Sequence, residues 1–291
     1  MVVATGVKVL ERAKKQKSSA QYRKARSLSA WDIVKISRHP QRPILQDYIQ
    51  RVFSNFVELH GDRAFGDDNA IIGGFARIGN QKIMLIGHNK GKNTTEQIER
   101  NFGMAKPEGY RKALRLMKLA QRFNLPIITI IDTPGAFPGL EAEERGQAES
   151  IARNITEMAN IEVPIISLVI GEGGSGGALG IGVGDRILML SNAIYSVISP
   201  EGCASILWRD ARYAPDAAEA LKITAHALFE NEVIDEIVEE PAEGAHADYD
   251  QIAADVKRSL LRNLRSLSNI SVYELLEQRF EKYAAMGKFA E

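Results

Sequence analysis

Apolar and polar positions follow two periods along this chain, one typical of helices and one typical of strands. Residues 107–123 place apolar side chains three and four positions apart, which predicts an amphipathic helix. Residues 70–78 and 82–87 flank Gly79-Asn80, which predicts a β-hairpin. The same patterns predict further helices over 29–39, 47–59, 141–160, 200–208, 215–230, 250–267 and 272–286, and strands over 126–132, 165–170, 186–190, 193–197 and within 232–241.

One strand pattern occurs twice. LPIITII (125–131) and VPIISLV (163–169) match at an offset of 38 residues, and each leads through a glycine-bearing loop into a helical pattern. Strand–loop–helix units at this spacing predict parallel strands joined by right-handed crossovers. Their loops, DTPGAFPG and GEGGSGGALG, would then lie side by side at the sheet edge where α/β proteins bind ligands.

The second of these loops is unusually rich in glycine. Five of the seven residues from 171 to 177 are glycine, which is costly in conformational entropy unless backbone must approach something closely. We expect a helix to begin near Ser175 and to present its first amides to an anionic oxygen. A tight turn that binds no ligand is the alternative.

Pattern matching alone does not identify that ligand. The turn satisfies the dinucleotide fingerprint G-x-G-x-x-G and the nucleophile-elbow pattern G-x-S-x-G around Ser175. Its doubled glycines also suit an oxyanion hole built from backbone amides. All three possibilities remain open at this point.

Composition narrows the class of protein. Hydrophobic residues make up 45% of the 291 residues and charged residues 25%, as in ordinary globular proteins of one large domain or two small ones. We expect a cytoplasmic protein, because no apolar run approaches the ~20 residues of a membrane span and no secretory signal is recognisable. A single cysteine, Cys203, excludes an internal disulfide framework and a cysteine-rich zinc site.

Charge is unevenly distributed along the chain. Residues 1–51 contain 12 Lys and Arg but only 3 Asp and Glu, although the whole chain is neutral. We therefore divide the chain into a basic helical N-terminal arm (1–59) and a main domain (60–291). A solvated face or a contact with another subunit explains the arm better than nucleic acid does, because no RNA-binding aromatic cluster accompanies it.

No metal site is expected. Asp62, Asp67 and Asp68 lie together in the stretch HGDRAFGDDNA, but their spacing matches no metal-binding loop, and a solvated turn is the better interpretation.

Six separated segments together resemble one known family. They are GHNKG, RNFGMAKPEGYRKALRLM, IDTPGAFPG, AEERGQAESIARN, VIGEGGSGGALGIGVGD and YSVISPEGCASILW. In this order they resemble the alpha subunit of the bacterial acetyl-coenzyme A carboxylase carboxyltransferase, from about residue 31 to the C-terminus. The resemblance implies an α/β, crotonase-like (ClpP/crotonase) spiral of ββα units with a helical N-terminal arm and C-terminal helices. Family members usually begin with a longer acidic helical segment, which we expect to be missing or truncated here.

The resemblance also implies a reaction. The family transfers a carboxyl group from carboxybiotin to acetyl-CoA and so forms malonyl-CoA, the first committed step of fatty acid synthesis. Both the biotin ureido group and the acetyl-CoA enolate become anionic, and each anion requires preorganised N–H donors. By analogy, the amides of Gly176 and Gly177 hold the ureido oxygen. Gly173 and Gly174 allow close approach to biotin, and Gly135 and Ala136 line the facing loop.

Partners follow from the same resemblance. It implies a carboxyltransferase beta subunit in an alpha2beta2 assembly, a biotin carboxyl carrier protein that presents carboxybiotin, and a biotin carboxylase that uses ATP. No cofactor is expected to be bound covalently here, and zinc is expected only on the beta subunit. The chain agrees with this division, because it has no Met-Lys-Met biotinylation site, no ATP-binding signature and no zinc-ribbon cysteines.

Several alternatives remain. Lys90, Lys92, Arg111 and Arg115 could contact coenzyme A phosphates, but solvated or interface charge explains them equally well. A serine acyl hydrolase would use Ser175 with His226 or His246. A dinucleotide-binding module would need an acidic residue after RILMLS, where Ser191-Asn192 stands. A non-catalytic scaffold subunit is the third alternative.

Overall fold

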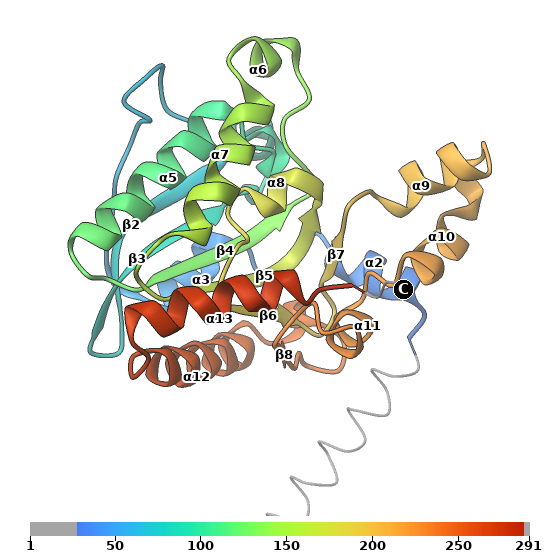
Figure 1. Ribbon diagram of the computed structural model, residues 1–291. Helices are drawn as coiled ribbons and strands as arrows, with labels where there is room; N and C mark the ends of the chain where they lie inside the picture. The colour runs from blue at the N-terminus through green and yellow to red at the C-terminus, as the bar shows by residue number, and fades with distance from the viewer. Residues whose placement is uncertain (1–27, 288–291) are drawn as a thin grey trace, which may run out of the picture.

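A computed structural model describes residues 28–287 (Figure 1). The basic stretch 1–27, which we expected to be a frayed helix or a tail, lies outside the described residues. Eight strands form one mixed sheet in the order β1-β2-β3-β4-β5-β6-β8, with β7 paired to β5. The strands are β1 (Ser54–Glu58), β2 (Ile71–Ile78), β3 (Gln81–His88), β4 (Ile127–Thr133), β5 (Ile165–Gly174), β6 (Arg186–Leu190), β7 (Ile194–Ser196) and β8 (Glu236–Val238).

The repeated strand pattern is confirmed as a pair of neighbouring parallel strands. In β4 and β5, Ile127 pairs with Ile165 and Ile128 with Ile166, so the register equals the 38-residue offset of the sequence repeat. Both strands are almost completely buried, as expected for parallel strands covered on both faces. The predicted hairpin is also confirmed, since β2 and β3 are antiparallel around Gly79.

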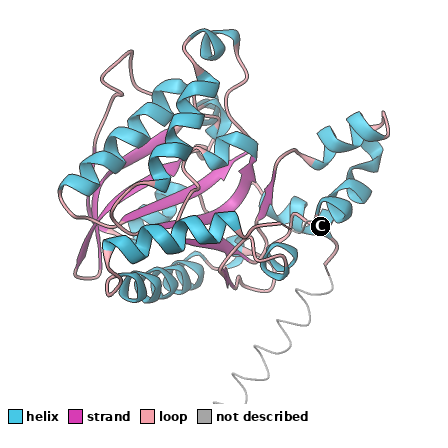
Figure 2. Cartoon of the chain, in the orientation of Figure 1, coloured by secondary structure: helices cyan, strands magenta, loops and turns pink. Residues whose placement is uncertain are grey.

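Helices cover both faces of this sheet (Figures 1 and 2). A Cβ atom at Gly73 would strike Leu116 of α5 (Pro107–Arg122), whereas one at Gly87 would strike Leu45 of α3 (Leu45–Val52). The two helices therefore lie on opposite faces. Helix α7 (Gln147–Ala159) packs beside α5, and α12 (Tyr249–Leu267) packs beside α3.

Two predicted elements are wrong in their extent. The helix expected over 47–59 ends at Val52, and the next residues form β1, because pairing with the edge of β2 satisfies their backbone groups. The strand expected over 165–170 continues to Gly174, because β7 pairs with its glycine-rich end. The sheet thus includes a segment that we assigned to the N-terminal arm.

Two predicted helices are each divided by a residue with positive φ. Gly146, at φ 83°, separates α6 (Leu140–Glu144) from α7. Lys222, at φ 55°, separates α10 (Ala214–Leu221) from α11 (Ala225–Glu230). A left-handed residue ends the helical hydrogen-bond ladder, so the apolar periodicity continues across a break that it cannot reveal.

The remaining helical elements mostly follow the prediction. Ser29 caps α2 by accepting a hydrogen bond from the Asp32 amide, and Ser199 caps α9 in the same way from the Gly202 amide. Helices α9 and α10 project from the body of the molecule (Figure 1). The elements not yet bounded are α2 (Ala30–Ser37), α4 (Thr94–Glu99), η1 (Asn101–Gly103), α8 (Ser175–Leu179), α9 (Pro200–Leu207), η2 (Ala211–Tyr213), η3 (Ala245–Ala247) and α13 (Val272–Ala284).

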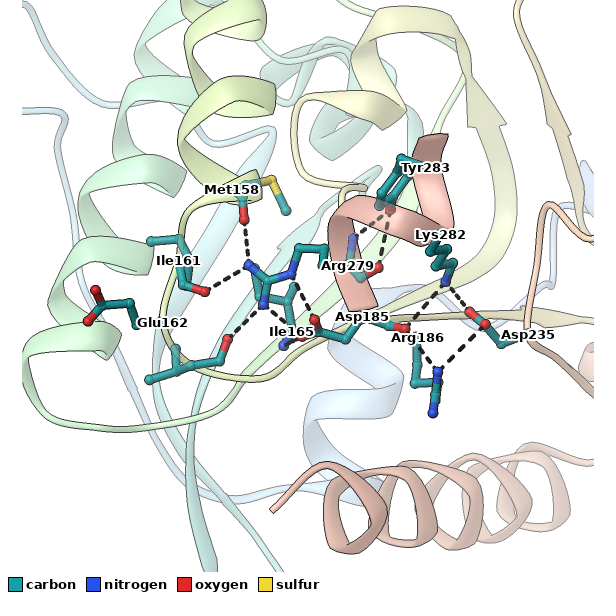
Figure 3. Close-up of polar contacts among 12 residues, drawn as sticks. Met158, Ile161, Glu162, Ile165, Asp185, Arg186, Asp235, Arg279, Lys282 and Tyr283 are labelled. Carbon is teal, nitrogen blue, oxygen red and sulfur yellow. Dashed lines mark hydrogen bonds and ion pairs between the residues drawn. The ribbon is translucent and has the colours of Figure 1, made fainter. Parts of the chain in front are cut away.

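A buried arginine fastens the C-terminal helix α13 to the amino edge of the parallel strands (Figure 3). Both Nε and NH2 of Arg279 lie 2.8 Å from the carboxylate of Asp185, just before β6. Its guanidinium also donates to the carbonyl oxygens of Met158 and Ile161, both at 2.7 Å. These contacts hold the C-terminal helix against the sheet. No helix in residues 28–287 has both the length and the apolar character needed to cross a bilayer.

Candidate active site

The two glycine-bearing loops meet at the carboxyl edge of β4 and β5, as the parallel pairing predicts. A Cβ atom at Gly174 would lie 2.1 Å from the carbonyl oxygen of Pro134. One at Gly177 would lie 2.4 Å from the carbonyl carbon of Gly135 and 2.5 Å from the Ala136 nitrogen. Backbone therefore packs directly on backbone, and Gly174 and Gly177 leave no room for a side chain.

The first amides of α8 are available to a ligand. The helix spans only Ser175–Leu179, and its N-cap, Gly174, provides no side chain to bond the N–H groups. Within residues 28–287, no side chain accepts a hydrogen bond from the Gly176 or Gly177 N–H, and both amides belong to the first turn of the helix, where N–H groups have no partner inside the helix. Gly176 is half-buried and Gly177 is buried. A helix N-terminus of this kind favours negative charge.

The facing loop contributes a further amide. The N–H of Gly135 donates to Thr133 Oγ1 at 3.2 Å, and that hydroxyl donates to the Gly135 carbonyl at 2.7 Å. Ala136 N–H donates to no protein acceptor in the described part of the chain. Of the two predicted residues in this loop, Ala136 therefore offers an amide, and Gly135 provides the surface against which Gly177 packs.

The other two predicted glycines differ in their surroundings. A Cβ atom at Gly173 would lie 2.7 Å from the ring of Tyr195, so this glycine makes room for an aromatic side chain. At Gly176 the nearest atom would be a methyl group of Ile151 at 3.7 Å, which is ordinary van der Waals contact. Gly176 thus tolerates a small side chain, whereas Gly173 and Gly177 do not.

A chain of ion pairs around two buried carboxylates supports the glycine turn, and sequence reasoning did not find it. Lys90 Nζ lies 2.7 Å from Asp132 Oδ1 and 3.0 Å from Glu172 Oε2, and Arg38 Nε lies 2.7 Å from Glu172 Oε1. Asp132 Oδ1 also accepts the Glu172 amide at 3.0 Å, and Gly171 leaves the space for that carboxylate.

These ion pairs keep both partners charged. Burial opposes charge on Glu172, but Lys90 and Arg38 lower the pKa of its carboxyl below the usual value. Burial likewise opposes charge on Lys90, but Asp132 and Glu172 raise the pKa of its ammonium. Lys90 is therefore bound by two carboxylates at the base of the turn.

The other cations considered for coenzyme A phosphates are also engaged within the chain. Lys92 Nζ lies 2.7 Å from Asp47, and Arg111 Nε lies 2.8 Å from Asp62. Arg115 Nε donates to the Gly61 carbonyl at 3.0 Å. These contacts favour the structural interpretation of these cations over a phosphate-binding role.

An apolar cavity of about 330 Å³ opens beside the start of α8. Ser175, at the first position of the helix, contributes one of its few polar groups. The remaining lining residues are Leu179, Gly182, Ile187, Tyr195, Ser196, Val197, Leu221, Leu228, Val233, Tyr283 and Met286. The cavity suits an uncharged, largely apolar group, and Ser175 and Leu179 are the residues of α8 that line it.

The serine hydrolase alternative lacks its base. Ser175 has the positive φ (51°) typical of a nucleophile elbow, but no histidine is among the residues that line its cavity. His246 instead stacks on His39, with ring centroids 3.7 Å apart. Within residues 28–287, no group of three or more metal-binding side chains comes together.

Comparison with known proteins agrees with this geometry. The family model described as acetyl co-enzyme A carboxylase carboxyltransferase-like matches residues 2–287. A protein of Geobacter metallireducens named acetyl-coenzyme A carboxylase carboxyl transferase subunit alpha is 58% identical, over 91% of this chain and 83% of its own length. The protein of the same name from Pseudoalteromonas atlantica is 61% identical, over 89% of this chain and 82% of its own length.

Solved structures share the fold at low sequence identity. Transcarboxylase 12S with bound methylmalonyl-coenzyme A superposes with a TM-score of 0.62 at 16% identity, covering 86% of this chain and 43% of that one. The beta subunit of geranyl-CoA carboxylase from P. aeruginosa gives a TM-score of 0.61 at 18% identity, covering 91% and 48%. This chain therefore spans less than half of each of those two polypeptides, and their fold confirms the crotonase-like architecture expected from the sequence.

The match covers almost the whole described chain, and the named relatives are subunits of a larger enzyme. The chain belongs to the family of acetyl-CoA carboxylase carboxyltransferase alpha subunits and is thus one subunit of a biotin-dependent carboxyl transferase.

Proposed function

We propose that this chain serves the biotin side of the carboxyl transfer that forms malonyl-CoA from acetyl-CoA. The observation that carries the proposal is the packing of the first turn of α8, with the amides of Gly176 and Gly177, directly on the facing loop with its free Ala136 amide. These amides would hold the ureido oxygen of biotin as it becomes negative. Such hydrogen bonds are strong where water is excluded, and an apolar cavity lies beside the start of the same helix.

The reaction needs charge stabilisation more than it needs side-chain acids or bases. The bond between the carboxyl carbon and the ureido nitrogen breaks, and its electron pair stays on the ureido group. That group takes a proton from the acetyl-CoA methyl, and the resulting enolate carbon attacks the released CO2. Backbone amides at Gly176, Gly177 and Ala136 suit the first anion, and the absence of a base beside Ser175 is consistent with this division of work.

The proposal includes separate partners. A homologous beta subunit, in an alpha2beta2 assembly, would provide most of the coenzyme A contacts and carry the zinc. A biotin carboxyl carrier protein would present carboxybiotin, which a biotin carboxylase forms with ATP. One feature supports this arrangement: Lys90 and Lys92 are held in internal ion pairs, which would leave the coenzyme A phosphates to another subunit.

Adjacent glycines provide a matched test. In a complex reconstituted with a beta-type subunit and a carboxybiotin donor, Gly177→Ala should lower the rate of malonyl-CoA formation by about 100-fold or more, because its Cβ would displace Gly135 and Ala136 from the anion. Gly176→Ala should keep most of the activity, because its Cβ meets only Ile151 at 3.7 Å and its amide is retained.

Size-exclusion chromatography of each complex checks that assembly survives. An assembled Gly177→Ala complex with wild-type activity would contradict the proposal and favour a scaffold subunit. Labelling of Ser175 by a fluorophosphonate would instead favour the hydrolase alternative.

A further inference from the structure

Three buried polar side chains converge on the carbonyl groups of α8. They are His88 at the end of β3, Tyr110 in α5 and Asn154 in α7, and each is at most 1% exposed. The Tyr110 hydroxyl donates to the Gly177 carbonyl at 3.3 Å. The Asn154 amide donates to the Gly180 carbonyl at 2.8 Å and to the Tyr110 carbonyl at 2.9 Å.

The helix cannot satisfy the Gly177 carbonyl by itself. The two amides that would close a helical bond on this oxygen are used elsewhere, since Gly180 N–H donates to Gly176 O and Ile181 N–H donates to Ala178 O. A buried carbonyl without a donor would be costly. The donor to the Gly177 carbonyl must therefore come from the side chains packed around α8. Tyr110 is the side chain that donates a hydrogen bond to it.

His88 lies near the same residue. Neither of its ring nitrogens has a hydrogen-bond partner within the described residues, and the Gly177 backbone favours the protonated ring. Burial, assisted by the charge of Lys90, lowers the pKa of His88 to about 3. The imidazole is thus neutral near pH 7, where it carries one N–H that it can donate.

We propose that His88, Tyr110 and Asn154 act as a clamp on the carbonyl side of α8 that fixes the direction of the Gly176 and Gly177 amides. They are positioning residues, because none of them needs to touch substrate. Donors on the carbonyls hold a helix that is too short to be rigid alone, so the amides need not reorganise when charge develops. This inference rests on the proposed function of those amides.

Two buried tyrosines give a matched pair of variants. Tyr110→Phe removes the hydroxyl that bonds Gly177 O, whereas Tyr48→Phe, in α3, removes an equally buried hydroxyl with no partner among the described residues. In the reconstituted complex, Tyr110→Phe should lower kcat about three- to tenfold and leave KM for acetyl-CoA unchanged. Tyr48→Phe should change neither.

Hydrogen exchange tests the clamp without the reaction. The Gly180 and Ile181 amides, which are bonded within α8 and its C-terminal turn, should exchange faster in Tyr110→Phe and at the wild-type rate in Tyr48→Phe.

His88 is tested by kinetics. His88→Leu should lower kcat, and His88→Gln, which keeps an N–H donor, should recover part of the lost kcat. The ratio of wild-type to His88→Leu kcat should be constant from pH 6 to 9, because His88 is neutral throughout.

The outcomes separate the two proposals. A wild-type kcat in Tyr110→Phe, equal exchange in the two tyrosine variants, or a step in the His88 ratio between pH 6 and 9 would each overturn the clamp. If the exchange difference is found but Gly177→Ala retains carboxyl transfer, then the clamp orders α8 but the amides have no catalytic role, and the proposed function is what fails.

Discussion

At the scale of the residue, Ser175 is the least typical position of the turn. It has φ 51°, a conformation that glycine adopts freely and serine does not, although four of its immediate neighbours are glycine. The chain thus keeps a side chain where backbone geometry favours none. Its hydroxyl lines the apolar cavity rather than bonding the helix.

Replacing Ser175 by glycine should therefore stabilise the fold. We expect Ser175→Gly to raise the free energy of unfolding by up to about 1 kcal/mol, because relief of the left-handed conformation outweighs the added flexibility of glycine. Ser175→Ala keeps the conformational penalty and should leave stability nearly unchanged. Urea denaturation of the three proteins measures the difference, and a less stable Ser175→Gly would show that the hydroxyl contributes to the fold.

At this scale, the sequence predicted the positions where only one residue type fits the backbone. Gly174 and Gly177 could be singled out because only glycine allows the backbone contact found there. The ion pair of Arg38 with Glu172 could not, since the two residues are 134 positions apart and only the folded sheet brings them together. The roles of Gly176 and Gly177 in catalysis stay predictions.

At the scale of the element, local pattern predicted what lies inside each element better than where it ends. The 38-residue repeat gave both the direction and the register of β4 and β5, because identical apolar patterns pack into equivalent positions of one sheet. β1 was missed because its residues also fit a helical period, and a neighbouring strand decided between the two. The breaks at Gly146 and Lys222 depend on single φ angles that periodicity does not report.

The loop from 60 to 70 gives a prediction about acid stability. The Asp62 carboxylate accepts the amides of Ala64, Phe65 and Gly66 and pairs with Arg111 of α5. Burial opposes its charge, but these bonds prevail and lower the pKa of Asp62 to about 2. The pKa of an aspartate in the unfolded chain is about 3.9. The stabilisation by Asp62 is therefore complete above about pH 4 and is lost as the pH falls toward 2.

Asp62→Asn should accordingly be less stable than the wild type at pH 7, and the difference should shrink between pH 4 and pH 2. The free energy of unfolding measured in urea at several pH values tests this. Asp216→Asn, at an exposed position of α10, is the control. A difference that does not depend on pH would mean that the Asp62 hydrogen bonds do not require its charge.

At the scale of the whole molecule, the ends of the described chain are tied to the sheet that carries the site. Arg38, just after α2, bonds Glu172 in β5 and Glu201 in α9. Arg42 lies between the Ile170 carbonyl and the Glu240 carboxylate, all buried. Arg279 fastens α13 to Asp185. Segments remote in sequence thus stabilise the strands that end at the glycine turn.

Removal of Arg279 should be severe. Arg279→Ala leaves the Asp185 carboxylate buried without its cation and should cost about 3–5 kcal/mol in the free energy of unfolding. Arg258→Ala, which breaks the exposed pair with Asp255, should cost less than about 1 kcal/mol. Thermal or urea denaturation compares them, and equal stabilities would contradict the role assigned to Arg279.

The direct packing of one loop's backbone on the other has an unusual genetic consequence. A hydrogen-bond donor that belongs to the main chain is present whatever the side chain, so no substitution except proline deletes it. Such a site is inactivated by adding atoms rather than by removing a functional group. Even the smallest enlargement of Gly174 or Gly177, to alanine, would therefore be harmful. The donors also carry no titratable proton, so any bell-shaped dependence of the reaction on pH should originate in the reactants or in the partner subunit.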